Sequence, residues 1–263
     1  MNLNLEGKVY IVTGGTGGIG EAIAKGLAAE GAIPVIIGRS KEKGHRVVKE
    51  IEAEGGQSKF ILASLGSEDI CKPIIEETVA ALGRIDGLVN NAGTNDGVGL
   101  ENGSPAAFQN SIVQNISHYY DLAHYSLPYL KKAKGSIVNI SSKTAITGQG
   151  GTSGYAASKG AQLSLTREWA VELAKFGIRV NAIIPAEVMT PQYKKWITTF
   201  ENPEEVLNDI VARIPLENRM TEADEIASMA VFLLSDKSSH TTGQWLFVDG
   251  GYVHFDRAML TNH

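Results

Sequence analysis

Short apolar runs alternate with longer amphipathic segments along almost the whole chain. The apolar runs are typical of buried strands, which we predict over residues 9–13, 33–38, 60–63, 85–90, 136–141, 178–184 and 245–248. The segments between them predict helices over 18–30, 41–54, 67–82, most of 105–130, 153–176 and 221–235. Gly31 marks the end of the first helix, and Ser67 is the expected N-cap of the third.

This alternation of strand and helix predicts the fold class. Strands that are apolar throughout are buried on both faces, which is the mark of a parallel sheet covered by helices on each side. We therefore expect a single α/β domain over residues 1–263, a Rossmann fold with a doubly wound, seven-stranded parallel sheet. Internal repeats and low-complexity linkers are absent from the sequence.

One segment, 189–218, breaks the regular rhythm. It carries Tyr193, Trp196 and Phe200 with charged residues between them, and three prolines. A long insertion after a late strand lies near the carboxyl end of a parallel sheet, where α/β proteins bind their ligands. The segment is therefore expected to form a lid over a substrate.

Composition excludes several classes of partner. The net charge is −5, from 24 basic and 29 acidic residues without a basic run, so a nucleic-acid partner is not expected. No apolar run approaches the ~20 residues of a membrane span, and Met1 to Gly7 does not resemble a signal peptide. The sole cysteine, Cys71, suits a reducing compartment, and the six histidines show no metal-ligand spacing. We expect a cytoplasmic protein without a metal.

A glycine-rich turn follows the first predicted strand. It reads Thr13-Gly14-Gly15-Thr16-Gly17-Gly18-Ile19-Gly20 and leads into the first predicted helix. Glycines allow the backbone to approach a pyrophosphate closely, and the helix N-terminus offers free N–H groups to the anion. The strand–turn–helix context predicts a dinucleotide site rather than a merely flexible loop.

Four motifs together resemble the short-chain dehydrogenase/reductase family. The glycine spacing with Thr13 is the first, and Asn90-Asn91-Ala92-Gly93 after the fourth strand is the second. Tyr155-Ala156-Ala157-Ser158-Lys159 is the third, and Asn181-Ala182-Ile183-Ile184-Pro185 with Thr190 is the fourth. The resemblance covers nearly the whole chain and implies an NAD(P)-dependent oxidoreductase that moves a hydride between a nicotinamide and a small hydroxyl or carbonyl compound.

Tyr155 is the candidate acid/base. Tyr155 and Lys159 are four residues apart in a predicted helix, so their side chains share one face. A free tyrosine has a pKa of about 10, and a neighbouring ammonium is expected to lower the pKa of Tyr155 so that it can exchange a proton with the substrate.

The resemblance implies that Ser142, about a dozen residues earlier, holds the reacting oxygen, whereas Ser141 faces the other side of its strand. It also implies that Asn115 supports a water connecting Lys159 to solvent, although an asparagine in a helix can equally be a packing residue.

The end of the second strand bears on the choice of cofactor. Gly38 stands where relatives that use NAD often carry Asp, and Arg39 with Ser40 could bind a 2′-phosphate. Position 17 is a glycine, whereas many relatives that use NADP carry a basic residue there, and this difference favours NAD. On balance NADP is favoured, and NAD stays open. The residues expected to contact the cofactor are Gly14, Thr16, Gly18, Ile19, Gly20, Arg39, Ser40, Ser64, Leu65, Asn90, Tyr155, Lys159, Val188 and Thr190.

Three segments, 185–191, 239–244 and 249–258, further resemble the bacterial L-fucose dehydrogenase branch of the family, which oxidises a pyranose at its anomeric carbon to a lactone. Gln149, Ser153, Glu187 and Trp196 are the candidate substrate residues. Glu187 could bind two hydroxyls or be only a loop ion-pair partner. Trp196 could lie against the apolar face of a sugar or only anchor the lid.

Two other functions stay open at this point. The same motifs suit an NADPH-dependent carbonyl or ketoacyl reductase, and a nucleotide-binding module without catalysis is the alternative from another class. Intact Ser142, Tyr155 and Lys159 argue against that module. The resemblance further implies a homodimer or homotetramer built on the helices at 105–130 and 153–176, with the tail at 252–260 reaching across an interface.

Overall fold

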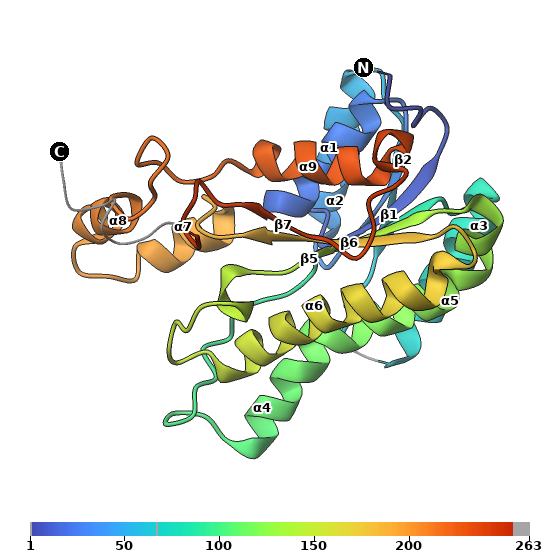
Figure 1. Cartoon of the computed structure of the whole chain (residues 1–263). Coiled ribbons are helices and arrows are strands. Elements are labelled where there is room, and N and C mark those ends of the chain that lie inside the picture. Colours follow the sequence, from blue (N-terminus) through green and yellow to red (C-terminus); the bar gives the residue numbers. More distant parts are fainter. Residues whose placement is uncertain (1, 67, 255–263) are drawn as a thin grey trace.

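Seven strands pair in parallel in the order β3-β2-β1-β4-β5-β6-β7 in the computed structural model, which describes residues 2–66 and 68–254 (Figure 1). The strands are β1 (Val9–Thr13), β2 (Ile33–Gly38), β3 (Lys59–Leu62), β4 (Gly87–Asn90), β5 (Ser136–Ile140), β6 (Arg179–Pro185) and β7 (Trp245–Val248). Every predicted strand is present within about two residues of its expected bounds. The predicted doubly wound Rossmann fold is confirmed.

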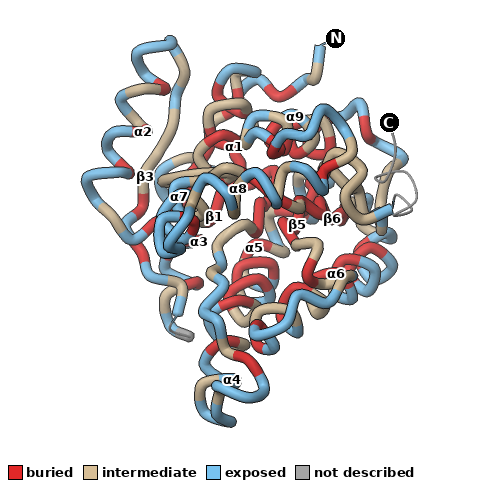
Figure 2. Tube along the Cα trace, turned by 90° about the vertical axis from the view of Figure 1, so that its left-hand side faces the viewer, coloured by how far each residue is buried: buried red, intermediate tan, exposed pale blue. Residues whose placement is uncertain are grey.

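The helices cover both faces of this sheet. They are α1 (Gly18–Ala29), α2 (Lys41–Ala53), α3 (Cys71–Leu82), α4 (Pro105–Ile112), α5 (His118–Ala133), α6 (Ser153–Ala174), α7 (Pro191–Ile197), α8 (Pro203–Val211) and α9 (Ala223–Leu234). Figure 1 shows α1 and α9 on one side of the strands and α5 and α6 on the other. Figure 2 shows the buried residues concentrated on the strands and on the inner sides of these helices.

Successive side chains of the central strand β1 pack alternately in two separate apolar layers. Val9 and Ile11 of β1 pack in the layer under α3, α5 and α6, whereas Tyr10 and Val12 pack in the layer under α1 and α9. Successive side chains of a strand point to opposite faces, so a strand buried on both faces must be apolar at every position. The uninterrupted apolar pattern of β1 therefore reflects its central place in the sheet.

The direction of winding reverses between β1 and β4, which are neighbours although β2 and β3 separate them in the sequence. The connections that leave β1 and β4 run to opposite sides of the sheet, which opens a crevice at the carboxyl ends of these strands. The glycine-rich turn after β1 lies at this edge, and so does the motif Asn90-Asn91-Ala92-Gly93 after β4, called the asparagine tetrad below.

The long predicted helix over 105–130 is interrupted. The chain forms α4, then a π-helical turn over Val113–Ser117, and then α5, which continues to Ala133. A π turn inserts one extra residue into a helical ladder and is often found at functional sites. Here it carries Asn115, one of the expected site residues.

Two further expectations concern local structure. Ser67, the expected N-cap of the third helix, lies outside the described residues, and α3 instead begins at Cys71 after a 3-10 turn over Glu68–Ile70. The expected lid segment holds α7 and α8, which lie together beyond the carboxyl end of β6 (Figure 1). The expected tail lies outside the described residues from position 255 onward.

Candidate active site

The end of β5 and the first turns of α6 bring Ser142 and Tyr155 together. The Ser142 hydroxyl accepts a hydrogen bond from the Thr144 N–H at 3.2 Å and is also hydrogen-bonded to Tyr155. Ser141 points away, as the strand alternation predicts, and its hydroxyl donates to the Lys159 carbonyl at 2.9 Å. The structure therefore selects Ser142 as the hydroxyl beside Tyr155.

Lys159 lies behind Tyr155, almost wholly buried at 3% exposure. Its ammonium group donates to the Ile140 carbonyl at 2.7 Å and lies 5.5 Å from the centroid of the Tyr155 ring. Because burial removes far more favourable hydration from a charged ammonium than from a neutral amine, it lowers the pKa of Lys159 to about 7.

The same desolvation acts on Tyr155 in the opposite direction. Burial raises the pKa of Tyr155 to about 12, while the Ser142 hydrogen bond opposes this shift by stabilising the phenolate. The expectation that the pKa of Tyr155 lies below the value of a free tyrosine is therefore wrong for the protein alone. The physical reason is that desolvation of the phenolate is the largest influence on it.

Asn115 is fully buried, and three hydrogen bonds fix its position. Its side-chain oxygen accepts from the Thr94 N–H at 2.8 Å, and its amide donates to the Ser111 carbonyl at 3.0 Å. Its main-chain carbonyl accepts from Gln162 Nε2 at 2.8 Å. Asn115 thus ties α4, the loop after β4 and α6 together, and Gln162 is a partner that the sequence motifs did not indicate.

The glycine-rich turn has the shape of an anion cradle. Gly14 and Gly18 adopt positive φ angles of 65° and 57°, which side-chain-bearing residues rarely adopt. A Cβ at Gly20 would lie 2.4 Å from the Gly14 carbonyl oxygen, so the turn folds directly onto the helix. Gly17, the N-cap of α1, has no side chain to occupy the free N–H groups, which remain available to a phosphate.

The asparagine tetrad fastens this cradle to β4. The Thr13 hydroxyl accepts from the main-chain N–H groups of Asn91 and Ala92 at 2.8 and 3.0 Å. Asn91 Nδ2 donates back to the Thr13 carbonyl at 2.8 Å. Asn90 is fully buried, donates to Asn139 at 3.0 Å, and its side-chain oxygen has no hydrogen-bond partner within the described chain.

The loop after β6 meets the cradle from the other side. A Cβ at Gly18 would lie 3.1 Å from the Thr190 methyl group, so the two loops approach closely. The Thr190 hydroxyl caps α7 by accepting from the Tyr193 N–H at 3.2 Å, and Val188 forms a parallel bridge with Thr221. The two loops therefore border one crevice, in which the glycine-rich turn could hold the phosphates of a dinucleotide.

The end of β2 provides no carboxylate for a ribose. A Cβ at Gly38 would lie 2.4 Å from the Thr16 methyl group, so Thr16 fills the space in which an acidic side chain would begin. Arg39 is exposed, and Ser40 caps α2 by accepting from the Lys43 N–H at 3.3 Å. Of the other expected cofactor residues, Ser64 is exposed, whereas Leu65 and Ile19 are half-buried.

The four candidate substrate residues differ in their surroundings. Glu187 is 9% exposed, forms an ion pair with Lys143 and is hydrogen-bonded to Tyr193. Trp196 packs edge-on against the rings of Tyr193 and Phe200, 5.1 and 5.0 Å away.

Gln149 and Ser153 are exposed. Sequence reasoning missed Lys143, and it treated Tyr193 as a lid residue only. The position of Lys143 directly after Ser142 was the available signal.

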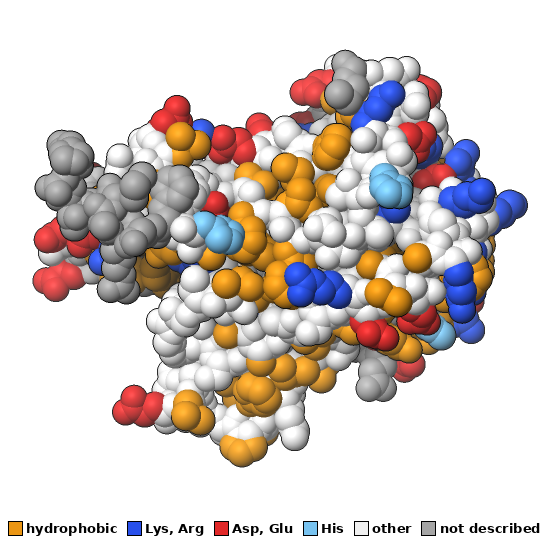
Figure 3. All heavy atoms as spheres, viewed as in Figure 1, with side chains coloured by type: hydrophobic (Ala, Val, Ile, Leu, Met, Phe, Trp, Pro, Cys, Tyr) orange, Lys and Arg blue, Asp and Glu red, His pale blue; other side chains and the backbone are white. Residues whose placement is uncertain are grey.

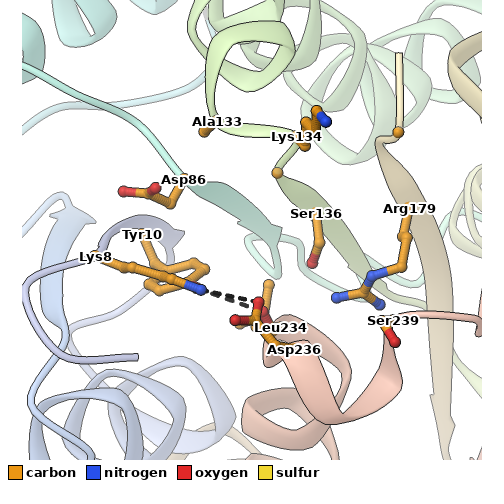
Figure 4. Close-up of a pocket in the computed structure, with 12 residues that line it drawn as sticks. Lys8, Tyr10, Asp86, Ala133, Lys134, Ser136, Arg179, Leu234, Asp236 and Ser239 are labelled. Carbon is orange, nitrogen blue, oxygen red and sulfur yellow. Dashed lines mark hydrogen bonds and ion pairs between the residues drawn. The ribbon is translucent and has the colours of Figure 1, made fainter. Parts of the chain in front are cut away.

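A separate cavity of about 140 Å³ lies at the opposite edge of the sheet, among the amino ends of β1, β5 and β6 (Figure 4). Three of its charged side chains have partners: Lys8 pairs with Asp236 at 2.9 Å, and Arg179 donates to the Ser235 carbonyl at 3.1 Å. The strands separate this cavity from Tyr155, so we assign it a structural role.

Neither a metal site nor a membrane span is found in the described ranges. No group of three or more His, Cys, Asp or Glu side chains in residues 2–66 and 68–254 could hold a metal ion. No helix in the same ranges has both the length and the apolar character needed to cross a membrane.

Comparison with known proteins identifies the family. The family model described as enoyl-(acyl carrier protein) reductase matches residues 14–253. The chain is 38% identical to 3-oxoacyl-(acyl-carrier-protein) reductase FabG of Thermotoga maritima, over 95% of this chain and 100% of that protein. It is 33% identical to L-fucose dehydrogenase of Bos taurus, over 95% of this chain and 91% of that protein.

A solved structure, described as that of Cj0485 dehydrogenase, is 49% identical and superposes with a TM-score of 0.93 over 98% of both chains. The glycine-rich cradle, the seven-stranded sheet and these matches lead to one conclusion. The chain belongs to the short-chain dehydrogenase/reductase family and is an oxidoreductase of the kind that uses a nicotinamide cofactor.

Proposed function

We propose that this enzyme oxidises an aldose such as L-fucose at its anomeric carbon to a lactone, with NADP as the cofactor. The observation that carries the proposal is a largely buried, charged pair between Lys143, the residue that follows Ser142, and Glu187 in the loop after β6. A site with charged hydrogen-bonding groups next to its acid/base suits a substrate with several hydroxyls. The relative named as L-fucose dehydrogenase supports this choice.

The roles of the side chains follow from their positions. A nicotinamide cofactor, which the glycine-rich turn and Thr190 would hold, would supply the hydride acceptor for oxidation and the hydride donor for the reverse reaction. Tyr155 accepts the hydroxyl proton, and Ser142, hydrogen-bonded to Tyr155, holds the substrate oxygen in reach of the phenol. Lys159 provides positive charge behind the ring as the phenolate forms, and Asn115 fixes the loop that closes this side of the site.

A ketoacyl or carbonyl reductase is the second candidate. The relative named as 3-oxoacyl-(acyl-carrier-protein) reductase is more similar in sequence, at 38% identity against 33% for the bovine L-fucose dehydrogenase. Its acyl substrate would require no charged pair beside the reacting carbon, which is why we rank it second. A nucleotide-binding module without catalysis is the third, and it predicts cofactor binding without turnover.

The first test follows the near-ultraviolet absorbance of reduced nicotinamide with a panel of aldoses, simple alcohols and ketones. We expect reduction of the cofactor with L-fucose or a stereochemically similar aldose. Tyr155→Phe should lower kcat by at least about 10²-fold, as loss of general acid–base catalysis does, while Tyr129→Phe on α5 serves as the control. Oxidation of NADPH by ketones without turnover of any sugar would assign the enzyme to the second candidate.

Lys159→Met separates catalysis from stability. Because the folded protein lowers the pKa of Lys159 from 10.5 to about 7, the unfolded chain binds this proton more tightly between those values. The wild type therefore gains stability as the pH rises through that window, and the variant lacks the gain. At pH 7 we expect the variant to be inactive yet to have a higher melting temperature than the wild type. For a chain of this size, each kcal/mol added to the free energy of unfolding raises the melting temperature by about 2–4 °C.

The measurement is the free energy of unfolding of both proteins as a function of pH. The advantage of Lys159→Met should shrink as the pH rises toward and above the ordinary lysine value, because the amine then becomes neutral in the unfolded chain as well as in the folded protein. Tyr119 also donates to the Ile140 carbonyl, at 3.2 Å, so this carbonyl keeps a hydrogen-bond partner in the variant. A variant less stable than the wild type at every pH would contradict the proposed cost of burying the ammonium.

Cofactor choice is tested at Arg39. A guanidinium binds a phosphate through charge-assisted hydrogen bonds, whose loss costs about 1.5–3 kcal/mol, or roughly 10- to 100-fold in affinity. Arg39→Ala should therefore lower kcat/KM for NADP⁺ by that factor and change kcat/KM for NAD⁺ little. Arg46→Ala is the matched control, since Arg46 lies on α2 and is already paired with Glu21 and Glu50. Equal losses with both cofactors would count against NADP.

A second copy of the chain is the partner that we propose for the face formed by α4, α5 and α6. Figure 3 shows hydrophobic side chains gathered over α4 and α6. Tyr120 of α5 is 54% exposed and Val171 of α6 is 81% exposed. Apolar side chains grouped on a surface are typical of an interface between proteins, and the family commonly forms oligomers.

This assembly is tested by light scattering. We expect the wild type to be a homodimer or homotetramer, and Tyr120→Glu to shift it toward the monomer, because a carboxylate would be buried without a partner in the interface. Leu62→Glu is the control, since Leu62 is equally exposed, at 55%, but lies on the edge strand β3. A monomeric wild type at working concentration would overturn the proposal.

A further inference from the structure

Four side chains from four separate segments meet in a cluster that includes Lys143, the residue directly after Ser142. Lys143 follows β5, Glu187 follows β6, Tyr193 belongs to α7, and Tyr252 lies in the turn after β7. Lys143 forms an ion pair with Glu187, and its ammonium group lies 4.2 Å from the centroid of the Tyr252 ring. Tyr193 is hydrogen-bonded to the Glu187 carboxylate, and burial together with the charge of that carboxylate raises the pKa of Tyr193 above its ordinary range.

The backbone on both sides of this pair is fixed. The Glu187 carbonyl accepts from the Thr221 N–H at 2.9 Å, next to the bridge between Val188 and Thr221. The Lys143 carbonyl accepts from the Ile146 N–H at 2.8 Å. The side chains of Lys143 and Glu187 are only 12% and 11% exposed. The pair is therefore held firmly just beyond the carboxyl ends of β5 and β6, with little contact with bulk water.

Such a pair is costly to bury. Removing two charges from water offsets most of the attraction between them, and apolar residues of similar volume are often no less stable in the same place. A wall that served only to close the site would not need these charges. Charged groups held in a cleft beside an acid/base residue are instead typical of recognition or catalysis.

The hydrogen-bonding capacity of the pair is only partly used. The Lys143 ammonium has three N–H donors, of which one faces Glu187. The Glu187 carboxylate can accept about four hydrogen bonds, of which Lys143 and Tyr193 use two. A donor and an acceptor side by side match two neighbouring hydroxyls, since one hydroxyl accepts from the ammonium and the other donates to the carboxylate.

We propose that Lys143 and Glu187 together bind a vicinal diol of the substrate that includes the hydroxyl next to the reacting carbon. The pair thereby selects polyhydroxylated substrates over acyl thioesters and simple ketones. This inference rests on the proposed oxidation of an aldose, and it assigns the specificity of that reaction to two residues. Tyr193 and Tyr252 act as positioning residues that hold the pair from the lid side and from the C-terminal side.

The test compares L-fucose with 2-deoxy-L-fucose, which lacks the hydroxyl next to the anomeric carbon. Hydrogen bonds to charged groups contribute about 1.5–3 kcal/mol each, so wild-type kcat/KM should favour L-fucose by roughly 10- to 100-fold. In Glu187→Gln and in Lys143→Met this ratio should fall toward one. A purely structural role would lower kcat/KM for both sugars by the same factor and leave the ratio intact, which would overturn the inference.

A second readout does not depend on turnover. L-fucose is titrated by calorimetry into Tyr155→Phe protein that holds NADP⁺, with and without Glu187→Gln. We expect the second substitution to weaken L-fucose binding by at least about 10-fold and to weaken 2-deoxy-L-fucose binding much less. Unchanged L-fucose binding in the double variant would also overturn the inference. Glu187→Gln preserves the shape of the side chain, so it is informative even if Lys143→Met does not fold.

The matched control is Glu77→Gln, in the Lys59–Glu77 pair that joins β3 to α3 at 2.9 Å, away from the active site. This variant should keep the wild-type preference between the two sugars.

Failure of the proposed function and failure of this inference give different results. A wild type that oxidises no aldose contradicts the proposed function itself. A wild type that oxidises L-fucose, with variants that keep its preference over the deoxy sugar, contradicts only the role of Lys143 and Glu187.

Discussion

Parallel pairing of β4 between β1 and β5 is the constraint on which every functional position depends. It places the ends of these three strands at one edge, so that the glycine-rich turn, the asparagine tetrad and Ser142 meet although many residues separate them in the sequence. Burial of the strands on both faces fixes this register, because a slip of one residue would exchange the two apolar layers. The active site is thus a consequence of the core, and its precision is that of the sheet.

Against this apolar background the protein places a few charges where they are energetically costly. Lys159 is held inside the molecule with its ammonium on a backbone carbonyl, and Lys143 and Glu187 are held just beyond the carboxyl ends of β5 and β6. Each costs stability that a hydrocarbon side chain would not. Their shared location at the carboxyl edge indicates that the cost is tolerated for chemistry, as the compromise between stability and activity leads one to expect.

Much of the fold, and part of the site, could be predicted from the sequence. The uninterrupted apolar runs located the strands, the four-residue spacing located Tyr155 and Lys159 on one face, and strand alternation distinguished Ser142 from Ser141. The π turn at Val113–Ser117 could not be predicted, because one additional residue in a helical ladder leaves no periodic signal. The Lys143–Glu187 pair joins positions 44 residues apart, and the pKa of Tyr155 depends on burial. Both are properties of the tertiary structure alone.

The contact between Gly38 and Thr16 restricts how cofactor preference can change during evolution. A carboxylate at the end of β2 would have to begin with a Cβ atom only 2.4 Å from the Thr16 side chain, inside the phosphate cradle. An acidic residue at position 38 is therefore accessible only after position 16 has become smaller or has moved. The order of the two substitutions matters, so lineages that descend from this sequence would retain their nucleotide preference until a change in the neighbouring loop permits the switch.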